Sequence, residues 1–129
     1  MQIIELNGNN FNSLITFYDE VEKKLTKNLD WKIGRNLNAF NDVLRGGFGM
    51  HEYEEPIKIT WTNSSKSKQD LGWDETILYA ESILTKCHPD NIAFVKEDIE
   101  LAKQKKGETL FEIITGIITS HSHIELVLK

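Results

Sequence analysis

Three short segments with the pattern of β-strands lie far apart in this chain, and helical patterns separate each one from the next. In residues 57–61, Ile-Lys-Ile-Thr-Trp, apolar and polar side chains alternate at a period of two, as in a strand with one buried face. This strand is expected to begin at Pro56, and residues 2–6 and 123–128 are interpreted as two further strands. Strands that alternate with helices favour a parallel sheet with right-handed crossovers. The sequence therefore predicts an α/β fold with a small three-stranded parallel sheet packed against helices.

Helical periodicity accounts for much of the remaining chain. A first helix is expected after the first strand, with Asn10, Asn12 or Ser13 available as its N-cap. Two additional central helices are expected over about residues 74–86 and 91–105, with Pro89 between them, and a last helix over about 108–119. The apolar side chains predicted to face the core are Phe11, Leu14, Ile15, Tyr18, Val21 and Leu25 in the first helix, Ile77, Ala80, Ile83 and Leu84 in the helix over about residues 74–86, and Ile92, Val95, Ile99 and Ala102 in the helix over about residues 91–105.

Length and composition limit the class of protein. A chain of 129 residues without a visible linker or internal repeat is expected to form one domain, residues 1–129. Its single cysteine, Cys87, cannot pair within the chain, which fits a reducing compartment. No signal-peptide pattern and no apolar run of about 20 residues is found, so we expect a soluble cytoplasmic protein without a membrane partner. A formal net charge of -5 disfavours direct binding of nucleic acid.

A short polar helix framed by glycines is predicted between Gly34 and Gly47. Leu37, Phe40 and Leu44 recur at i, i+3 and i+7, which defines a buried stripe. The residues left on the other side are Asn38, Asn41, Asp42 and Arg45. One acidic side chain, held outward among polar neighbours, indicates a surface that recognises a partner.

In order and spacing, residues 34–47 resemble the interface helix of the barstar family, small intracellular proteins that plug the active site of a secreted ribonuclease. Three other regions agree with this family: the first strand leading through Asn7-Gly8 into a helix, Ser67-Lys68 downstream of Trp61, and the closing helix, turn and strand. Residues 48–55 and about 70–106 have little or no counterpart in the compact family prototype. The resemblance implies a barstar-like fold with additional central helices.

The resemblance also implies a set of partner-binding residues. Asp42 matches the family's principal acidic anchor, which would enter the nuclease pocket that an RNA phosphate normally fills. A carboxylate there would form charge-assisted hydrogen bonds with Arg and Lys. Three residues match the family, namely Gly34, Asn36 and Gly46. Contact residues of the family are replaced here by Lys32, Arg35, Asn38, Asn41, Gly47 and Gly116. Ile113 occupies a neighbouring position, and Arg45 adds positive charge to the rim. The implied face is less acidic and less aromatic than the family's, which indicates a nuclease with a different rim.

What the resemblance implies is an intracellular inhibitor of the antitoxin or immunity type. It would bind a secreted or toxin ribonuclease one to one and occlude its active site, without catalysis, a cofactor or a metal. The net negative charge suits a protein that mimics phosphate in a basic cleft, although ordinary solubility explains that charge equally well.

Other readings of the same residues stay open. A protein-interaction module with the barstar-like fold could bind a different toxin or a partner that is no nuclease, and Asp42 could be a solvated helix residue. Phe48 and Tyr53, in the glycine-containing loop 46–55, could pack internally or contact the partner. The imidazoles His51, His88, His121 and His123 and the thiol of Cys87 lack the spacing of a zinc site, and surface or capping roles explain His121 and His123 more simply. No nucleophile accompanies Asp42 and His51, so an enzyme is the weaker hypothesis.

Overall fold

The computed structural model describes residues 1–26, 34–46 and 51–129. These residues form three strands, β1 (Gln2–Asn7), β2 (Ile57–Thr62) and β3 (Ile124–Leu128), in one sheet of order β1-β2-β3. Both neighbouring pairs are parallel, with Ile4 opposite Ile59 and Ile59 opposite Leu126. The predicted three-stranded parallel sheet is confirmed, and β2 is its central strand.

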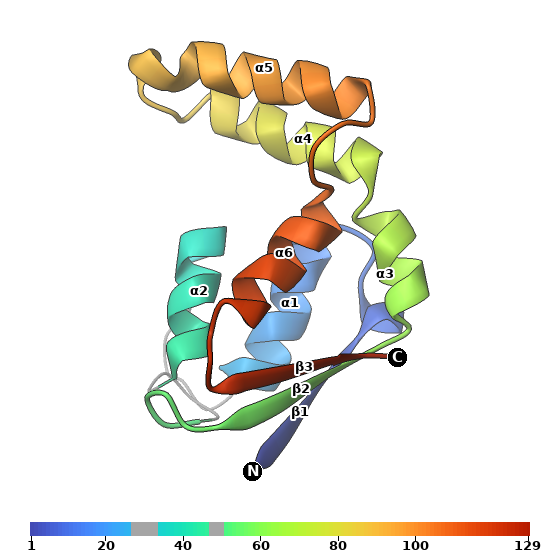
Figure 1. The fold of residues 1–129 in the computed structure, drawn as a ribbon, viewed down its shortest axis with the longest axis vertical. Coiled ribbons are helices and arrows are strands. Elements are labelled where there is room, and N and C mark those ends of the chain that lie inside the picture. The colour runs from blue at the N-terminus through green and yellow to red at the C-terminus, as the bar shows by residue number, and fades with distance from the viewer. Residues whose placement is uncertain (27–33, 47–50) are drawn as a thin grey trace.

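The helices that complete the core lie on one side of this sheet (Figure 1). They are α1 (Leu14–Leu25), α2 (Leu37–Arg45) and α6 (Leu110–Thr119). Because side chains alternate along a strand, Ile4 is buried beneath the helices, while its neighbour Ile3 is 66% exposed on the other face. The alternation of apolar and polar side chains in the β2 sequence has the same cause, because successive side chains of a strand point to opposite faces of the sheet.

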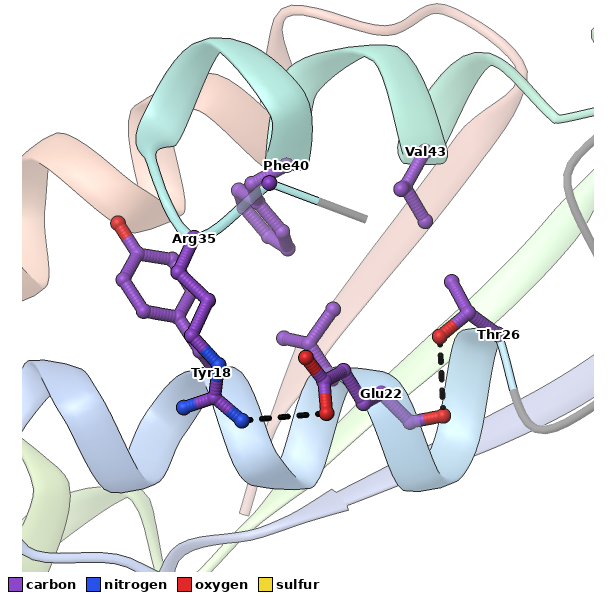
Figure 2. A pocket seen from close by; sticks show the side chains of 8 residues that line it. Tyr18, Glu22, Thr26, Arg35, Phe40 and Val43 are labelled. Carbon is purple, nitrogen blue, oxygen red and sulfur yellow. Dashed lines mark hydrogen bonds and ion pairs between the residues drawn. The ribbon is translucent and has the colours of Figure 1, made fainter. Parts of the chain in front are cut away.

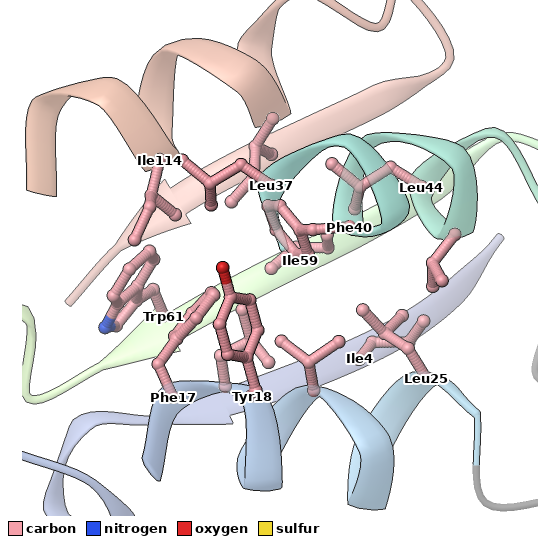
Figure 3. Close-up of a cluster of buried hydrophobic side chains, with 14 of the residues drawn as sticks. Ile4, Phe17, Tyr18, Leu25, Leu37, Phe40, Leu44, Ile59, Trp61 and Ile114 are labelled. Carbon is pink, nitrogen blue, oxygen red and sulfur yellow. The ribbon is translucent and has the colours of Figure 1, made fainter. Parts of the chain in front are cut away.

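Aromatic side chains at the centre of the core join the sheet to all three of these helices. The rings of Trp61 in β2 and Phe17 in α1 are stacked, with centroids 5.7 Å apart. Phe40 of α2 meets Phe17 edge-on at 5.4 Å, and Phe111 of α6 meets Trp61 at 5.1 Å. Figure 3 shows Phe17, Phe40 and Trp61 converging between α1, α2 and β2. The position of α2 therefore depends directly on this aromatic cluster.

The core-facing side of α1 differs from the prediction at two positions. Phe17 is fully buried although the predicted stripe omits it, and Ile15, which the stripe includes, is 69% exposed. The prediction is wrong here because it counts Phe11 as helical, whereas the N-cap is Ser13 and α1 begins at Leu14. At about 100° per residue, Ile15 points away from the side that Leu14 and Phe17 share.

A short helix, α3 (Ser64–Asp70), follows β2 and has no counterpart in the sequence prediction, because its residues form no apolar stripe. Its Ser67 hydroxyl accepts a hydrogen bond from indole Nε1 of Trp61 at 3.0 Å, and both side chains are fully buried. Gly8, in the 3-10 turn η1 (Gly8–Asn10), passes close to the same hydroxyl. A Cβ on Gly8 would lie 2.4 Å from Ser67 Oγ, so only glycine fits there. The spacing from Trp61 to Ser67 thus corresponds to a buried contact between α3 and the central strand.

Two further helices form a hairpin that stands away from the sheet (Figure 1). They are α4 (Trp73–Leu84) and α5 (Ile92–Lys103), with the 3-10 turn η2 (Pro89–Asn91) between them. They confirm the two predicted central helices. Ile99 and Ala102 of α5 are buried as expected, together with Ala80 of α4.

Hydrogen bonds fix the base of this hairpin to the rest of the fold. The Leu14 amide at the start of α1 donates to Glu75 Oε1 at 2.8 Å, and the Leu110 amide at the start of α6 donates to Thr76 Oγ1 at 2.7 Å.

Across the described residues, no helix is long and apolar enough to cross a membrane.

The Trp61–Ser67 contact leads to a prediction about stability. Ser67→Ala leaves the indole N–H buried without an acceptor, which should lower the free energy of unfolding by about 1–3 kcal/mol. Urea denaturation measures this, and Ser65→Ala, at an exposed position of the same helix, is the matched control. Equal losses in the two variants would show that the hydrogen bond contributes nothing.

Candidate functional site

Helix α2 has an apolar side and a polar side. The residues buried against the core are Leu37, Phe40, Val43 and Leu44, which confirms the predicted stripe. Asn38, Asp42 and Arg45 are exposed, and Asn41 is partly buried. The Asp42 side chain is 60% exposed, and its carboxylate lies 3.7 Å from the guanidinium of Arg45, itself 52% exposed. Because both groups are in water, this ion pair is weak and leaves Asp42 available to another cation.

The beginning of α2 is fixed by two side chains. Asn36 is its N-cap, and Asn36 Oδ1 accepts from the Ala39 amide at 2.8 Å. Arg35, one residue earlier, reaches back to α1 and donates to the carboxylates of Asp19 and Glu22 at 2.5 and 3.1 Å. The Glu22 contact is visible in Figure 2. Arg35 therefore ties α2 to α1.

Between α1 and the start of α2 lies a small cavity, bordered by Tyr18, Glu22, Thr26 and Phe40 (Figure 2). Its volume is about 10 Å³, roughly the space that one water molecule needs. Glu22 Oε1 is buried there, and among the described residues it has no hydrogen-bond partner. The cavity is a packing gap and is too small for a ligand.

A larger groove, of about 480 Å³, runs between α1, the start of α2 and α4. Its lining includes Ile15, Asn38 and two tyrosines, Tyr18 and Tyr79. Burial raises the pKa of Tyr18 to about 12, with a smaller contribution from Tyr79, and burial also raises the pKa of Tyr79. Both phenols are therefore neutral hydrogen-bonding groups at physiological pH.

The end of α2 turns at Gly46, which is buried and has φ +97°. A Cβ at this position would lie 2.0 Å from the backbone oxygen of Glu52, so glycine is required by both conformation and space. The Glu54 amide donates to the Arg45 carbonyl at 2.5 Å and holds the returning chain against the helix.

Three histidines surround the same end of α2. His51 Nε2 and His123 Nε2 lie 3.0 and 2.9 Å from the carbonyl oxygen of Leu44, one of the last carbonyls of the helix. His121 Nε2 lies 2.7 Å from Oδ1 of Asn41. The centroids of the His121 and His123 rings are 5.5 Å apart. Where the structure describes the chain, no group of three His, Cys, Asp or Glu side chains is arranged to hold a metal ion.

The pKa of His121 lies below its ordinary value of about 6.5. Burial is the main cause, and the nearby His123 and Arg45 add to it, while Glu54 acts in the opposite direction. His121 is therefore neutral at pH 7, and one of its ring nitrogens donates while the other accepts.

The structure brings some of the predicted partner-binding residues together. Along α2 and the residues that lead into it lie Gly34, Asn36, Asn38, Asn41, Asp42 and Arg45. His121, in the turn after α6, contacts Asn41 and so connects α2 to the end of α6. Gly116 of α6 is exposed, with open space where a Cβ would stand. Ile113 is partly buried against the core. Gly46 is buried, so its role within the fold is to end α2, and Lys32 and Gly47 lie outside the described residues.

A family model described as barstar (barnase inhibitor) matches residues 1–95 of the chain. The chain belongs to the barstar family. The matched residues include β1, α1, α2, β2 and α4. Barstar family members are inhibitors of barnase-type ribonucleases. A search of curated protein sequences found no match to this chain.

Only part of the candidate site lies within the residues that match the barstar family model. The α2 face lies inside it, whereas Ile113, Gly116 and His121 lie beyond residue 95. The match also continues into residues 70–95, part of the segment for which the sequence predicted little counterpart in the family.

The histidines are the members of this site that sequence reasoning left without a function. The signal that could have found them is the alternation of His121 and His123 at the start of a strand, which places both rings on one side. Their contact with α2 depends on the parallel register of β3, which the sequence pattern does not specify.

The turn at Gly46 leads to a prediction about the site's framework. Gly46→Ala should lower the free energy of unfolding well beyond Gly107→Ala, because the new Cβ collides with the Glu52 backbone. Gly107 also has positive φ but open space, so its replacement should cost only about 1–2 kcal/mol. Thermal or urea denaturation compares the two, and equal losses would contradict the close approach at Gly46.

A second prediction follows from His121. Because its folded-state pKa is lowered, its contribution to stability is present above about pH 6.5 and is lost as the pH falls through the folded-state pKa. The free energy of unfolding of the wild type should therefore decrease between pH 7.5 and 5, and that of His121→Gln should decrease less. His88→Gln, at an exposed histidine, is the control. The interpretation fails if all three proteins show one pH dependence.

Proposed function

We propose that this protein inhibits a ribonuclease by binding it one to one and covering its active site with the α2 face. The observation that carries the proposal is Asp42: its carboxylate is exposed on a helix whose buried side is fixed in the core. At the active site it would occupy the place of an RNA phosphate and accept hydrogen bonds from Arg and Lys. Such charge-assisted bonds strengthen when the interface excludes water and each buried charge is matched.

The support of α2 at both ends favours this function. Asn36 and Arg35 hold its beginning, and Gly46 with the histidine contacts holds its end. Binding then requires little additional ordering of the helix, and ordering is a main cost of association. The same support would keep Asp42 in one orientation during the encounter.

Charge also favours a cationic partner. The chain carries a formal net charge of -5, and a ribonuclease must attract the phosphates of RNA. Opposite potentials would accelerate association and disfavour partners of the same sign. Nucleic acid itself is no direct partner in this proposal.

The proposed face consists of Asp42 with Gly34, Asn36, Asn38, Asn41 and Arg45 around it and Gly116 on α6. Lys32, Gly47 and Ile113 remain predicted contacts from the family resemblance. Gly46 contributes by ending the helix.

In the cell, an inhibitor of this kind would protect its producer from a secreted or toxin ribonuclease. The role is that of an antitoxin or immunity protein in the cytoplasm, and it involves binding without catalysis.

Asp42→Ala should weaken ribonuclease binding by about 30-fold or more, because losing one partner of a buried charge pair costs roughly 2 kcal/mol or more. Immobilised wild type, Asp42→Ala and Glu97→Ala are exposed to native cell lysate and culture medium, and retained proteins are identified by mass spectrometry. Glu97→Ala removes an equal charge from an exposed position on α5, far along the chain from the proposed face. A ribonuclease retained by wild type and Glu97→Ala, and lost with Asp42→Ala, is the expected result.

The retained ribonuclease is then titrated with each variant in an RNA cleavage assay. Inhibition that survives Asp42→Ala unchanged would reject this residue as the anchor. A different class of protein retained equally by all three variants would instead make the chain an interaction module built on the barstar fold.

A further inference from the structure

Asn41 is the residue of the α2 face whose side-chain orientation is fixed by a contact from a distant part of the chain. It lies between the buried stripe and Asp42, and it is partly buried. Its Oδ1 lies 2.7 Å from Nε2 of His121, in the turn that joins α6 to β3. Among the described residues, the other side-chain hydrogen bond from this turn to α2 is that of His123, which meets the backbone carbonyl of Leu44 and no side chain of the helix.

The chemistry of this contact assigns the proton on His121. An amide oxygen has no hydrogen to donate, so Nε2 must carry the hydrogen and Nδ1 of the neutral ring is the acceptor. His121 is neutral at pH 7 because burial and the charges of its neighbours lower its pKa. The contact therefore selects one tautomer.

The orientation of the Asn41 amide follows from the same contact. With its oxygen directed at His121, its Nδ2 group is directed away from the ring, and among the described residues no acceptor within the protein engages it. The neighbouring residue on the helix is Asp42, whose side chain is 60% exposed. An amide donor and a carboxylate acceptor are thus carried by consecutive residues of α2, about 100° apart around the helix axis.

We propose that Asn41, oriented by His121, is a specificity-determining residue of this inhibitor, and that it selects a ribonuclease with a hydrogen-bond acceptor beside its phosphate-binding cations. This inference rests on the proposed function. Asp42 engages the cations, and Asn41 Nδ2 donates to the acceptor, which is a carboxylate, a neutral imidazole or a backbone carbonyl. A nuclease that presents a donor or a cation at that point leaves both donors unpaired and is disfavoured.

His121 is a positioning residue in this arrangement, since it acts on the partner through Asn41. His51 and His123 fix the backbone of α2 at Leu44 and leave the amide of Asn41 untouched. Their contacts hold the helix in place while His121 sets the direction of one side chain.

The first test uses the free protein. Nitrogen-15 NMR of the histidine rings at pH 7 distinguishes the two neutral tautomers, and the expected result is a hydrogen on Nε2 of His121. Replacement of Asn41 by Ala should change the His121 ring signals, while Asn38→Ala, at an exposed position of the same helix, should leave them in place. A hydrogen on Nδ1 alone would overturn the assigned orientation, whatever the partner is.

The second test measures the dissociation constant for the ribonuclease retained by the wild-type protein. Asn41→Ala and His121→Phe should each weaken binding by about 3- to 10-fold, as expected for one hydrogen bond. Their combination should weaken it no further than the stronger single change, because both remove the same contact. His121→Gln, which retains a donor, should stay within about twofold of wild type.

Two results would overturn the inference in this test: multiplicative effects of Asn41→Ala and His121→Phe, or full affinity of Asn41→Ala. If full affinity of Asn41→Ala accompanies loss of binding in Asp42→Ala, the proposed function stands and only the role of Asn41 is wrong. Circular dichroism and urea denaturation of each variant separate a change in binding from a failure to fold.

Discussion

The stacking of Phe17 on Trp61 is the contact on which the rest of this structure depends. Trp61 lies in the central strand, fully buried, and its indole N–H is bonded to Ser67 in α3. Phe17 brings α1 onto the sheet, and Phe40 places α2 against Phe17 at 5.4 Å. Aromatic rings bury large areas and prefer a few relative orientations, so they set helix positions as well as contributing stability. The core therefore sets the position of the candidate binding helix, because Phe40 of α2 packs on Phe17 and Phe17 packs on Trp61 of the sheet.

Position alone would leave the ends of a helix of this length free to fray, and the structure fixes both of them. At the first end, Arg35 is bonded to Asp19 and Glu22 of α1, and at the last, the Leu44 carbonyl meets two imidazoles. The contacts at the last end come from His51, in the chain before β2, and from His123, directly before β3, so α1 and the segments that enter the sheet together hold the helix. The backbone that carries the exposed carboxylate of Asp42 is therefore held in place before any partner arrives. This is the physical sense in which the fold prepares the proposed function.

Periodicity in the sequence predicted the elements that rely on one apolar face, namely the three parallel strands, the buried stripe of α2 and the two central helices. It failed where side chains act through polar contacts. α3 has no stripe, and its place is set by the buried Trp61–Ser67 hydrogen bond. Ile15 was placed in the core because the stripe was extended back to Phe11, which precedes the N-cap Ser13. Asp42 could be named from the sequence, whereas the contact between Asn41 and His121, 80 residues apart, depends on tertiary packing that no local pattern encodes.

The structure also changes how the charges of this face are understood. From sequence, Arg35 replaces an acidic contact residue and indicates an altered rim on the nuclease. Its guanidinium is instead engaged by two carboxylates of α1, so among the described residues near α2, Arg45 is the cation that the proposed partner would meet. With Asn38 and Asn41 as neutral neighbours, Asp42 would supply most of the charge attraction toward the proposed partner. Electrostatic steering contributes mainly to association rates, whereas directional amide contacts act on dissociation and discrimination. For this member of the barstar family, we infer that selectivity resides in the amides beside Asp42 more than in the total charge of the face.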